Sequence, residues 1–398
     1  MRMVKAVMTA LLILVLGMSL VSVHAQRGDC PDPFAGGLLR FSTGLWPKTD
    51  FCQHSVSYED IRSGGPPPNG IPPVGFPEQP HLNMPALPDP TFESIADASG
   101  WLQPQSPVIA LSVDGDSRAY PLAILIWHEI VNDTVGDVPV AVTFCPLCNS
   151  SIVFDRRVDG ETLFFGTTGN LRNSDLVMWD HLTQSWWQQF TGEAIVGSYT
   201  GTRLTMLPSQ VVGFGQFAAQ YPDGQVLSRE TGTDRSYGRN PYTLYDTSSD
   251  PFLFEGSIDT RLPATSHVLA GLVDGQAVAY PFSVLKEAVV INDTVGEQAV
   301  VAFWQPGVAS ALDAASIDQS RDIGTAALFK AELDGQTLVF EAAADGTIRD
   351  TTTGSTWNAF GTAISGSLEG SQLQQIIAAP HFWFAWAAFQ PDTLIYGR

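Results

Sequence analysis

Short runs in which apolar and polar residues alternate follow one another between residues 107 and 230. The runs VIALSVDG, PVAVTF, SSIVFDRRV and ETLFFGT have the period of two that is typical of a strand with one buried face. The Asp159-Gly160 pair predicts a hairpin turn between the last two runs. Pro121 suits the first position of a short helix that ends near Trp127, and the NDTVG sequence that begins at Asn132 is typical of a turn. The pattern therefore predicts a mostly β, α+β fold with short helices.

The same pattern occurs a second time, 160 residues further along the chain. The segment that begins at Leu111 reads LSVDGDSRAYPLAILIWHEIVNDTVGDVPVAVTFCPLC, and the segment that begins at Gly271 reads GLVDGQAVAYPFSVLKEAVVINDTVGEQAVVAFWQPGV. Each copy later contains an apolar, helix-like run, VVGFGQFAAQYP or HFWFAWAAFQP. A repeat of this length indicates a domain duplication rather than a solenoid. We expect two tandem domains of one fold, residues 91–230 and 268–398, joined by a connector of residues 231–267, with the second copy degenerate.

The N-terminal residues have the pattern of an export signal. Arg2 and Lys5 precede an apolar run, and a small-residue cleavage site ends at Ala25. The alternative is an N-terminal membrane anchor. We expect residues 1–25 to be removed, the protein to be periplasmic or extracellular, and no membrane span to remain. Residues 26–62 form a cysteine-bearing segment, and residues 63–90, with ten prolines and four glycines, predict an extended linker outside the core.

The net charge and the cysteine content restrict the kinds of binding partner and the disulfides that we expect. The chain has 41 Asp and Glu against 20 Lys and Arg, so its surface repels phosphate backbones and we expect no nucleic-acid partner. Export would place the four cysteines in a compartment where disulfides persist. Short sequence separation favours Cys30 with Cys52, and Cys145 with Cys148.

Comparison of the two copies separates residues that the fold needs from residues that only chemistry needs. The turns and several aromatic residues are kept in both copies. The following residues of the first copy have no chemical equivalent in the second: Cys145, Cys148, His128, Glu129, His181 and residues 172–175. We expect one functional site within residues 108–230, with the second domain packed against it or covering it. The alternative is neutral drift of polar surface residues.

Several motifs of the first copy, in the same order, resemble the Domain of Unknown Function 3179 family of prokaryotic proteins. They are TFCPLCNSSIVFDRRVDG, LRNSDLVMWD, SWWQQFTGEAI and YGRNPY. The resemblance covers residues 85–260 well and the second copy weakly, and the family has no assigned activity. In this family the second cysteine position is sometimes threonine and sometimes selenocysteine. The resemblance thus implies that Cys145 matters most, and it favours redox chemistry.

The leading hypothesis is a thiol-based redox site at the Cys-x-x-Cys motif, in a possible thiol oxidoreductase for which the sequence identifies no cofactor. Cys145 would attack and Cys148 would resolve, with His128 and Arg172 as cationic partners that lower the pKa of the Cys145 thiol. Its partner would be a small molecule or a protein thiol or disulfide. The substrate would bind to Asn173, Asp175 and Trp186.

Two alternatives remain open for the same motif. The first is a zinc or copper site, in which His128 and His181 complete a four-ligand set with Cys145 and Cys148. The second is a non-catalytic ligand-binding or structural module, in which the cysteines form a short-range disulfide or are simply buried. A ligand would then contact Arg172, Asp175 and a tryptophan cluster that includes Trp186.

Overall fold

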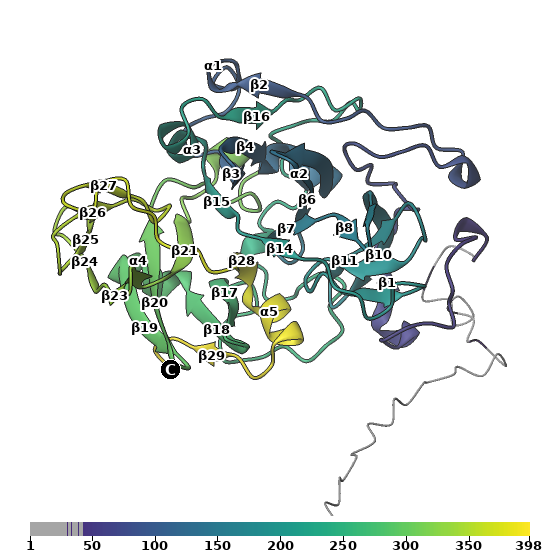
Figure 1. The fold of residues 1–398 in the computed structure, drawn as a ribbon. Coiled ribbons are helices and arrows are strands. Elements are labelled where there is room, and N and C mark those ends of the chain that lie inside the picture. Colours follow the sequence, from purple (N-terminus) through teal and green to yellow (C-terminus); the bar gives the residue numbers. More distant parts are fainter. Residues whose placement is uncertain (1–29, 31–32, 34–38, 40–42) are drawn as a thin grey trace, which may run out of the picture.

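Strands form 40% of the described residues and helices 13%, which confirms a mostly β protein. The structure is a computed structural model that describes residues 30, 33, 39 and 43–398 (Figure 1). The predicted signal peptide, residues 1–25, lies outside the described residues. Cys30 and Cys52 form a disulfide, with their Cα atoms 5.0 Å apart. Among the described residues, no helix has the length and apolar character needed to cross a bilayer.

Three sheets build the first half of the chain. One sheet has the order β15 (Gln210–Gly213), β3 (Pro107–Val113), β4 (Asp116–Pro121), β16 (Gln225–Leu227) and β2 (Phe92–Ser94). Another has the order β14 (Met206–Leu207), β7 (Ser150–Asp155), β6 (Val138–Cys145) and β5 (Ile130–Val135). The third has the order β1 (Ile61–Ser63), β10 (Phe165–Arg172), β11 (Asp175–Asp180), β12 (Trp186–Gln188) and β13 (Ala194–Val196). The remaining elements are the hairpin of β8 (Arg157–Val158) and β9 (Glu161–Thr162), and the helices α1 (Ile95–Ala98), α2 (Leu122–His128) and α3 (Phe214–Gln220).

The second half also contains three principal sheets. One has the order β28 (Ala378–Phe382), β17 (His267–Val273), β18 (Gln276–Pro281) and β29 (Leu394–Ile395). The others are β19 (Val290–Val295), β20 (Gln298–Gln305) and β21 (Thr325–Lys330), and then β24 (Phe340–Ala342), β25 (Ile348–Asp350), β26 (Thr356–Trp357) and β27 (Ala363–Ser365). The hairpin of β22 (Glu332–Leu333) and β23 (Gln336–Thr337) and the helices α4 (Phe282–Ala288) and α5 (Trp383–Phe389) complete it. Five 3₁₀ helices lie in the described chain: η1 (Thr43–Leu45), η2 (Tyr58–Asp60), η3 (Pro80–Leu82), η4 (Tyr245–Thr247) and η5 (Ile317–Gln319).

The two halves have the same order of elements around helices α2 and α4. In each half an antiparallel hairpin leads to a seven-residue helix and then to a second hairpin: β3–β4, α2 and β5–β6, or β17–β18, α4 and β19–β20. The Tyr120 hydroxyl donates to Asp133 at 2.6 Å, and the Tyr280 hydroxyl donates to Asp293 at 2.9 Å. Similar side-chain hydrogen bonds therefore occur at positions that the sequence repeat aligns.

The predicted helices are present, with one difference at the start of α2. Pro121 is the N-cap residue, with φ of −62°, and the helix begins one residue later than predicted. The two apolar runs at the ends of the copies form α3 and α5. The predicted Asp159-Gly160 turn joins β8 to β9, and both residues have positive φ, 51° and 85°.

The NDTVG sequence forms a strand rather than the predicted turn. Residues 132–135 belong to β5, and the turn begins only at Gly136. The Asn132 side chain accepts from Phe165 N at 2.8 Å and donates to Phe165 O at 2.9 Å. Asn292 makes the same two bonds with Phe340, at 2.9 and 2.7 Å. The turn prediction is wrong because each amide side chain satisfies the backbone of another sheet instead of its own chain.

The proline-rich segment of residues 63–90 is part of the core, which contradicts the prediction of an external linker. Val74 N donates to Ile130 O at 2.9 Å, and Asn132 N donates to Val74 O at 2.9 Å. Val74 and Phe76 are buried. The segment is extended, as its proline content predicts, but its few apolar residues pair with and pack on the first half.

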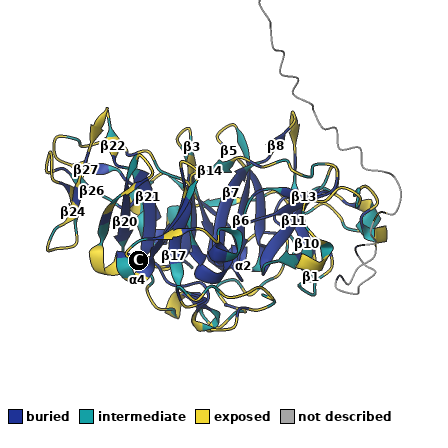
Figure 2. Cartoon of the chain, turned by 90° about the horizontal axis from the view of Figure 1, so that it is seen from below, coloured by how far each residue is buried: buried dark blue, intermediate teal, exposed yellow. Residues whose placement is uncertain are grey.

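The largest buried cluster of apolar residues includes side chains of both halves. It extends from α2 and the β5–β6–β7 strands to β17, β28 and α5. Figure 2 shows that the sheet strands of both halves are mostly buried, whereas the exposed residues lie mainly in the connections. The two halves thus share a core, and β28 lies next to β7.

Candidate functional site

Cys145 is the last residue of β6, and Cys148 lies in the tight turn that leads into β7. Cys145 pairs with Ser150 across this hairpin, and Asn149 N donates to Pro146 O at 3.2 Å. Asn149 has a left-handed backbone, with φ of 49°, which asparagine tolerates better than most residues. The turn brings both sulfur atoms to one side, where the cysteines are buried and free.

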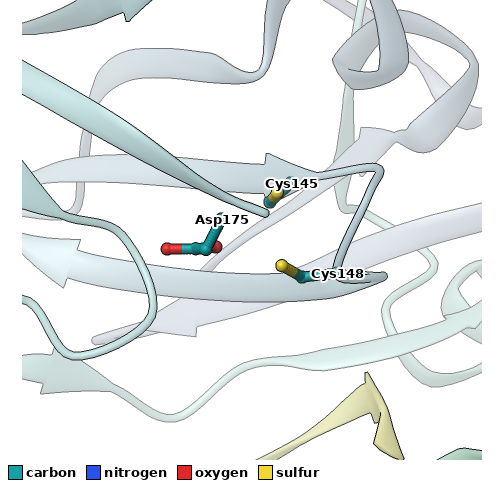
Figure 3. Close-up of side chains that lie close together, drawn as sticks. All are labelled: Cys145, Cys148 and Asp175. Atoms are coloured by element: carbon teal, nitrogen blue, oxygen red, sulfur yellow. The ribbon is translucent and has the colours of Figure 1, made fainter. Parts of the chain in front are cut away.

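A second hairpin places Asp175 beside the two sulfur atoms. Strands β10 and β11 pair Arg172 with Asp175, which leaves Asn173 and Ser174 as a two-residue loop. Both loop residues have positive φ, 52° and 64°, as a type I′ turn requires. Ligand atoms of Cys145, Cys148 and Asp175 all lie within 4.8 Å of one another (Figure 3).

The Ser174 carbonyl and the Asp175 carboxylate define the polar side of this cluster. The Ser174 oxygen lies 3.4 Å from the Cys148 sulfur and 3.8 Å from the Cys145 sulfur. Asp175 Oδ2 accepts from Gln188 Nε2 at 2.6 Å and from Phe190 N at 2.9 Å. Asp175 Oδ1 is buried without a hydrogen-bond partner among the described residues. A buried carboxylate oxygen in this state is costly unless a proton or a cation satisfies it.

Burial favours the protonated forms of the groups in the free site. Desolvation raises the pKa of the Cys145 thiol and raises that of Cys148 well above its ordinary value. Burial also raises the pKa of Asp175 to about 7, against the hydrogen bonds from Gln188 and Phe190 and the interactions with the two cysteine thiols. Burial and the nearby Asp175 charge raise the pKa of Glu129 to about 8. The predicted lowering of the Cys145 pKa is therefore wrong, because burial raises this pKa and the nearby carboxyl groups of Asp175 and Glu129 act in the same direction.

His128 faces away from the cysteines, contrary to both the redox and the metal hypotheses. Its Nδ1 lies 2.7 Å from Pro72 O, and its Nε2 lies 2.6 Å from the Tyr237 hydroxyl. Both ring nitrogens are thus engaged outside the cluster. Burial lowers the pKa of His128 to about 4, so the imidazole is neutral near pH 7. It cannot act as the cationic partner that was predicted.

Arg172 and His181 also lie outside the group of metal-ligand atoms. The Arg172 guanidinium stacks 5.7 Å above the Phe389 ring and donates to Gln188 Oε1 at 3.4 Å. Gln188 in turn donates to the Asp175 carboxylate, so it links the guanidinium to that group. His181 Nδ1 accepts from Phe164 N at 3.1 Å. The predicted ligand set with His128 and His181 is therefore not assembled, and Asp175 is the third possible ligand.

The remaining predicted substrate residues have structural positions. Trp186 is fully buried, with its ring 5.2 Å from Trp46 and 5.7 Å from Phe51. Its assignment to a binding surface is wrong, because the N-terminal segment covers it. Asn173 provides the first left-handed residue of the β10–β11 turn. Of the three residues predicted to bind substrate, Asp175 is the one that lies with the cysteines.

Comparison with known proteins identifies one family. The model of the family described as "Protein of unknown function (DUF3179)" matches residues 82–393. The chain belongs to this family. No curated protein and no solved structure matches it. The match extends through both halves, further than the sequence motifs alone indicated.

In this DUF3179 protein, Glu129 and residues of the connector complete the surroundings of the site. Glu129 follows α2 with a left-handed backbone, φ 59°, and its carbonyl accepts from Phe144 N at 2.8 Å. The charges of Glu129 and Cys145 help to raise the pKa of Tyr242, and the Cys148 charge helps to raise that of Tyr245, although burial is the larger cause for both tyrosines. Glu129 is one of the residues without a counterpart in the second copy, where Val289 stands, although it was not predicted to be a site residue.

The second half closes the site from the other side. Phe382 N in β28 donates to the Cys148 carbonyl at 2.8 Å. The Asn149 side chain lies 3.2 Å from His267 Nδ1. The Ser174 hydroxyl donates to the Phe252 carbonyl in the connector. The Cys-x-x-Cys turn is thus held by both halves of the chain.

Proposed function

We propose that Cys145, Cys148 and Asp175 bind a thiophilic metal ion, zinc or copper. The observation that carries this proposal is the convergence of three buried ligand atoms within 4.8 Å of one another. Asp175 Oδ1 supports it, because this oxygen is buried without a partner and a bound cation would satisfy it. Metal binding would displace the protons that burial retains on these groups.

Two sulfur atoms and one carboxylate oxygen suit zinc or copper better than magnesium or calcium, which prefer sets of oxygen ligands. Three protein ligands would leave one position of a tetrahedral zinc ion open, as in catalytic zinc sites. Glu129 lies near Cys145 and Asp175, and burial raises its pKa to about 8. A carboxyl group with such a pKa suits proton transfer near neutral pH. We therefore propose a metal centre with an acid–base residue beside it.

Metal analysis of natively purified protein tests the proposal. We expect about one zinc or copper ion per chain, by analogy with mononuclear sites, and its release when the cysteines are modified. Cys145→Ser, Cys148→Ser and Asp175→Asn should each lose the metal. Glu129→Gln should keep it, because Glu129 is not part of the ligand group.

Asp159→Asn is the matched control for Asp175→Asn. Asp159 lies in an exposed turn of the same half, with a positive φ that asparagine accepts. Its metal content should equal that of the wild type. Native protein that contains no metal, and that takes up neither zinc nor copper(I) when reconstituted, would contradict the metal centre.

The second candidate is the thiol redox site. The observation that favours it is that both cysteines are free and their sulfur atoms lie within 4.8 Å. A partner disulfide would accept two electrons, and the two thiols would become the Cys145–Cys148 disulfide with release of their protons to the reduced partner. Metal-free protein should then react rapidly with a disulfide reagent, and Cys145→Ser should abolish the fast phase. The raised pKa values of both thiols oppose fast reaction at neutral pH, so we rank this function second.

We also infer that the chain is an exported protein with two duplicated units, of which the first carries the site. The shared element order and the matching hydrogen bonds of Tyr120 and Tyr280 support the duplication. The Cys30–Cys52 disulfide supports an oxidising compartment. N-terminal sequencing of the mature protein tests export, and a chain that begins at residue 1 would contradict it.

A further inference from the structure

A cavity of about 280 Å³ lies between the two halves of the protein. On one side its walls come from β7, β14 and the segment after β12, and on the other side from β17, β28 and α5. The walls are mainly apolar, as Val153, Met206 and Ala378 illustrate. The cysteines and Asp175 do not line it. It is therefore separate from the candidate metal centre.

Aromatic rings form one end of this cavity. His381 stacks on Trp386 with centroids 5.4 Å apart, and Phe190 lies 4.6 Å from the His381 ring. All three side chains line the cavity. Ring faces and edges of this kind favour an aromatic ligand, because offset and edge-to-face contacts add to the burial of apolar surface.

His381 supplies a polar group that is not satisfied by the protein. The residue is 3% exposed, and its Nδ1 is buried without a hydrogen-bond partner in the described chain. Burial lowers the pKa of His381 to about 3, so the ring is neutral at physiological pH. Arg203 also lines the cavity, but it pairs with Glu193 at 2.6 Å. The His381 ring is thus an uncharged polar group in the wall of the cavity.

We propose that this cavity binds a small neutral aromatic molecule that carries one hydrogen-bonding substituent. The ring would lie against Phe190 and Trp386, and the substituent would bond to His381. A cavity of about 150 Å³ lined by apolar residues holds benzene, so 280 Å³ accommodates one or two rings with a short substituent. A charged ligand is disfavoured, because it would be desolvated without a free counter-ion.

The cavity shares one residue with the site described above. Phe190 lines the cavity with its ring and donates its backbone N–H to Asp175 Oδ2. A molecule bound in the cavity would contact Phe190, whose backbone N–H is hydrogen-bonded to the candidate metal ligand Asp175. Binding in the cavity does not depend on the metal, however, so the two proposals can fail separately.

Phenol, benzene, cyclohexanol and benzoate are the probes for this site, used with the metal-free protein and the protein reconstituted with zinc. Ligand-detected NMR and calorimetry should show saturable binding of phenol. One hydrogen bond to a buried group corresponds to roughly tenfold in affinity, so phenol should bind about tenfold more tightly than benzene. Cyclohexanol and benzoate should bind more weakly than phenol.

Two variants test the geometry. His381→Phe keeps a ring but removes the nitrogen, so benzene should still bind while the preference for phenol disappears. Ala379→Phe places a ring in the cavity, which Ala379 lines, and should weaken both probes by about tenfold or more, because a filled cavity cannot hold them. Thermal melting checks that each variant folds, and metal content should be unchanged in both.

Wild-type protein that shows no saturable binding of phenol or benzene would overturn the proposal, whatever the variants do. Retention of the phenol preference in folded His381→Phe would also overturn it. Tighter binding of benzoate than of phenol would show that the ligand is an anion and would contradict the neutral site. Loss of metal in the Asp175→Asn variant with phenol binding retained would separate this site from the metal centre.

Discussion

Replacing His128 by glutamine should change how the stability of the protein depends on pH. The Pro72 carbonyl can only accept, so Nδ1 of His128 donates to it, and Nε2 accepts from the Tyr237 hydroxyl. This neutral ring has a pKa of about 4 in the folded protein, against an ordinary value of 6.5. The unfolded chain therefore binds a proton at higher pH than the folded chain does.

The sign and size of the effect follow from this difference. Where the unfolded state binds more protons, stability falls as the pH falls, so the contribution of His128 is lost between about pH 6.5 and pH 4. For pKa values of 6.5 and about 4, the loss between pH 8 and pH 5 is about 2 kcal/mol. The His128→Gln variant keeps a donor and an acceptor but lacks this titration.

Urea unfolding at pH 8 and at pH 5 measures the free energy of unfolding of both proteins. The wild type should lose about 2 kcal/mol more than His128→Gln over this interval. Using the difference between the two proteins cancels the titration of the acids around the cysteines. His54→Gln, which removes an exposed histidine, is the control for loss of a histidine as such. A variant that loses as much stability as the wild type would refute the neutral, buried imidazole.

Three further perturbations test the fold. Asn132→Ala should lower the free energy of unfolding by about 2–4 kcal/mol, because two buried backbone groups of Phe165 lose their hydrogen-bond partners. Urea unfolding measures this change, and a loss below about 1 kcal/mol would contradict the structural role of these two hydrogen bonds. Cys52→Ser should cost roughly 3 kcal/mol, the chain-entropy value for a loop of 22 residues, and reductant should lower the melting temperature of the wild type but not of the variant. Gly169→Ala should lower the free energy of unfolding by more than about 2 kcal/mol, because φ is +75° and the added Cβ atom would lie 2.0 Å from Pro66 O. An unchanged melting temperature would show that the proline-rich segment does not pack there.

The elements that the sequence predicts well are those that local pattern determines. Alternation located β3, β6 and β7, and apolar runs located α3 and α5. The cysteine pair and residues 172–175 were also visible as candidates, because the second copy lacks them. The local sequence pattern does not predict the hydrogen-bond partner of a side chain when that partner lies in a strand that is distant in the sequence. Asn132 is such a case, since its turn-forming sequence lies within a strand.

The site shows the same limit at Glu129. His128 and Glu129 are adjacent in the sequence, and a regular helix geometry does not indicate which of the two side chains lies toward the cysteines. Glu129 takes a left-handed conformation at the end of α2, which redirects the chain and separates the two side chains. His128 then bonds to Pro72 and Tyr237, while Glu129 is buried near Cys145. Non-glycine residues adopt this conformation rarely, so the sequence favoured the wrong neighbour.

The residues that only the first copy has are buried, and this burial helps to explain why the two copies differ at these positions. Neutral drift was the alternative explanation, and it applies to exposed polar residues. Cys145, Cys148, Glu129 and Asp175 are all buried, with at most 8% of their surface exposed. Buried polar groups are costly, and a fold that needs only a scaffold gains nothing from keeping them.

The corresponding turn of the second half shows what such a scaffold uses instead. After β20 ends at Gln305, Gly307 N and Val308 N donate to the Asp322 carboxylate at 2.8 and 3.1 Å. This carboxylate satisfies the backbone of the turn locally. In the first half the Cys148 carbonyl accepts from Phe382 N, and the sulfur atoms face Ser174 and Asp175. The turn of the second half is therefore closed by a carboxylate of its own half, whereas the turn of the first half places two sulfur atoms beside Asp175 and is covered by β28 of the second half.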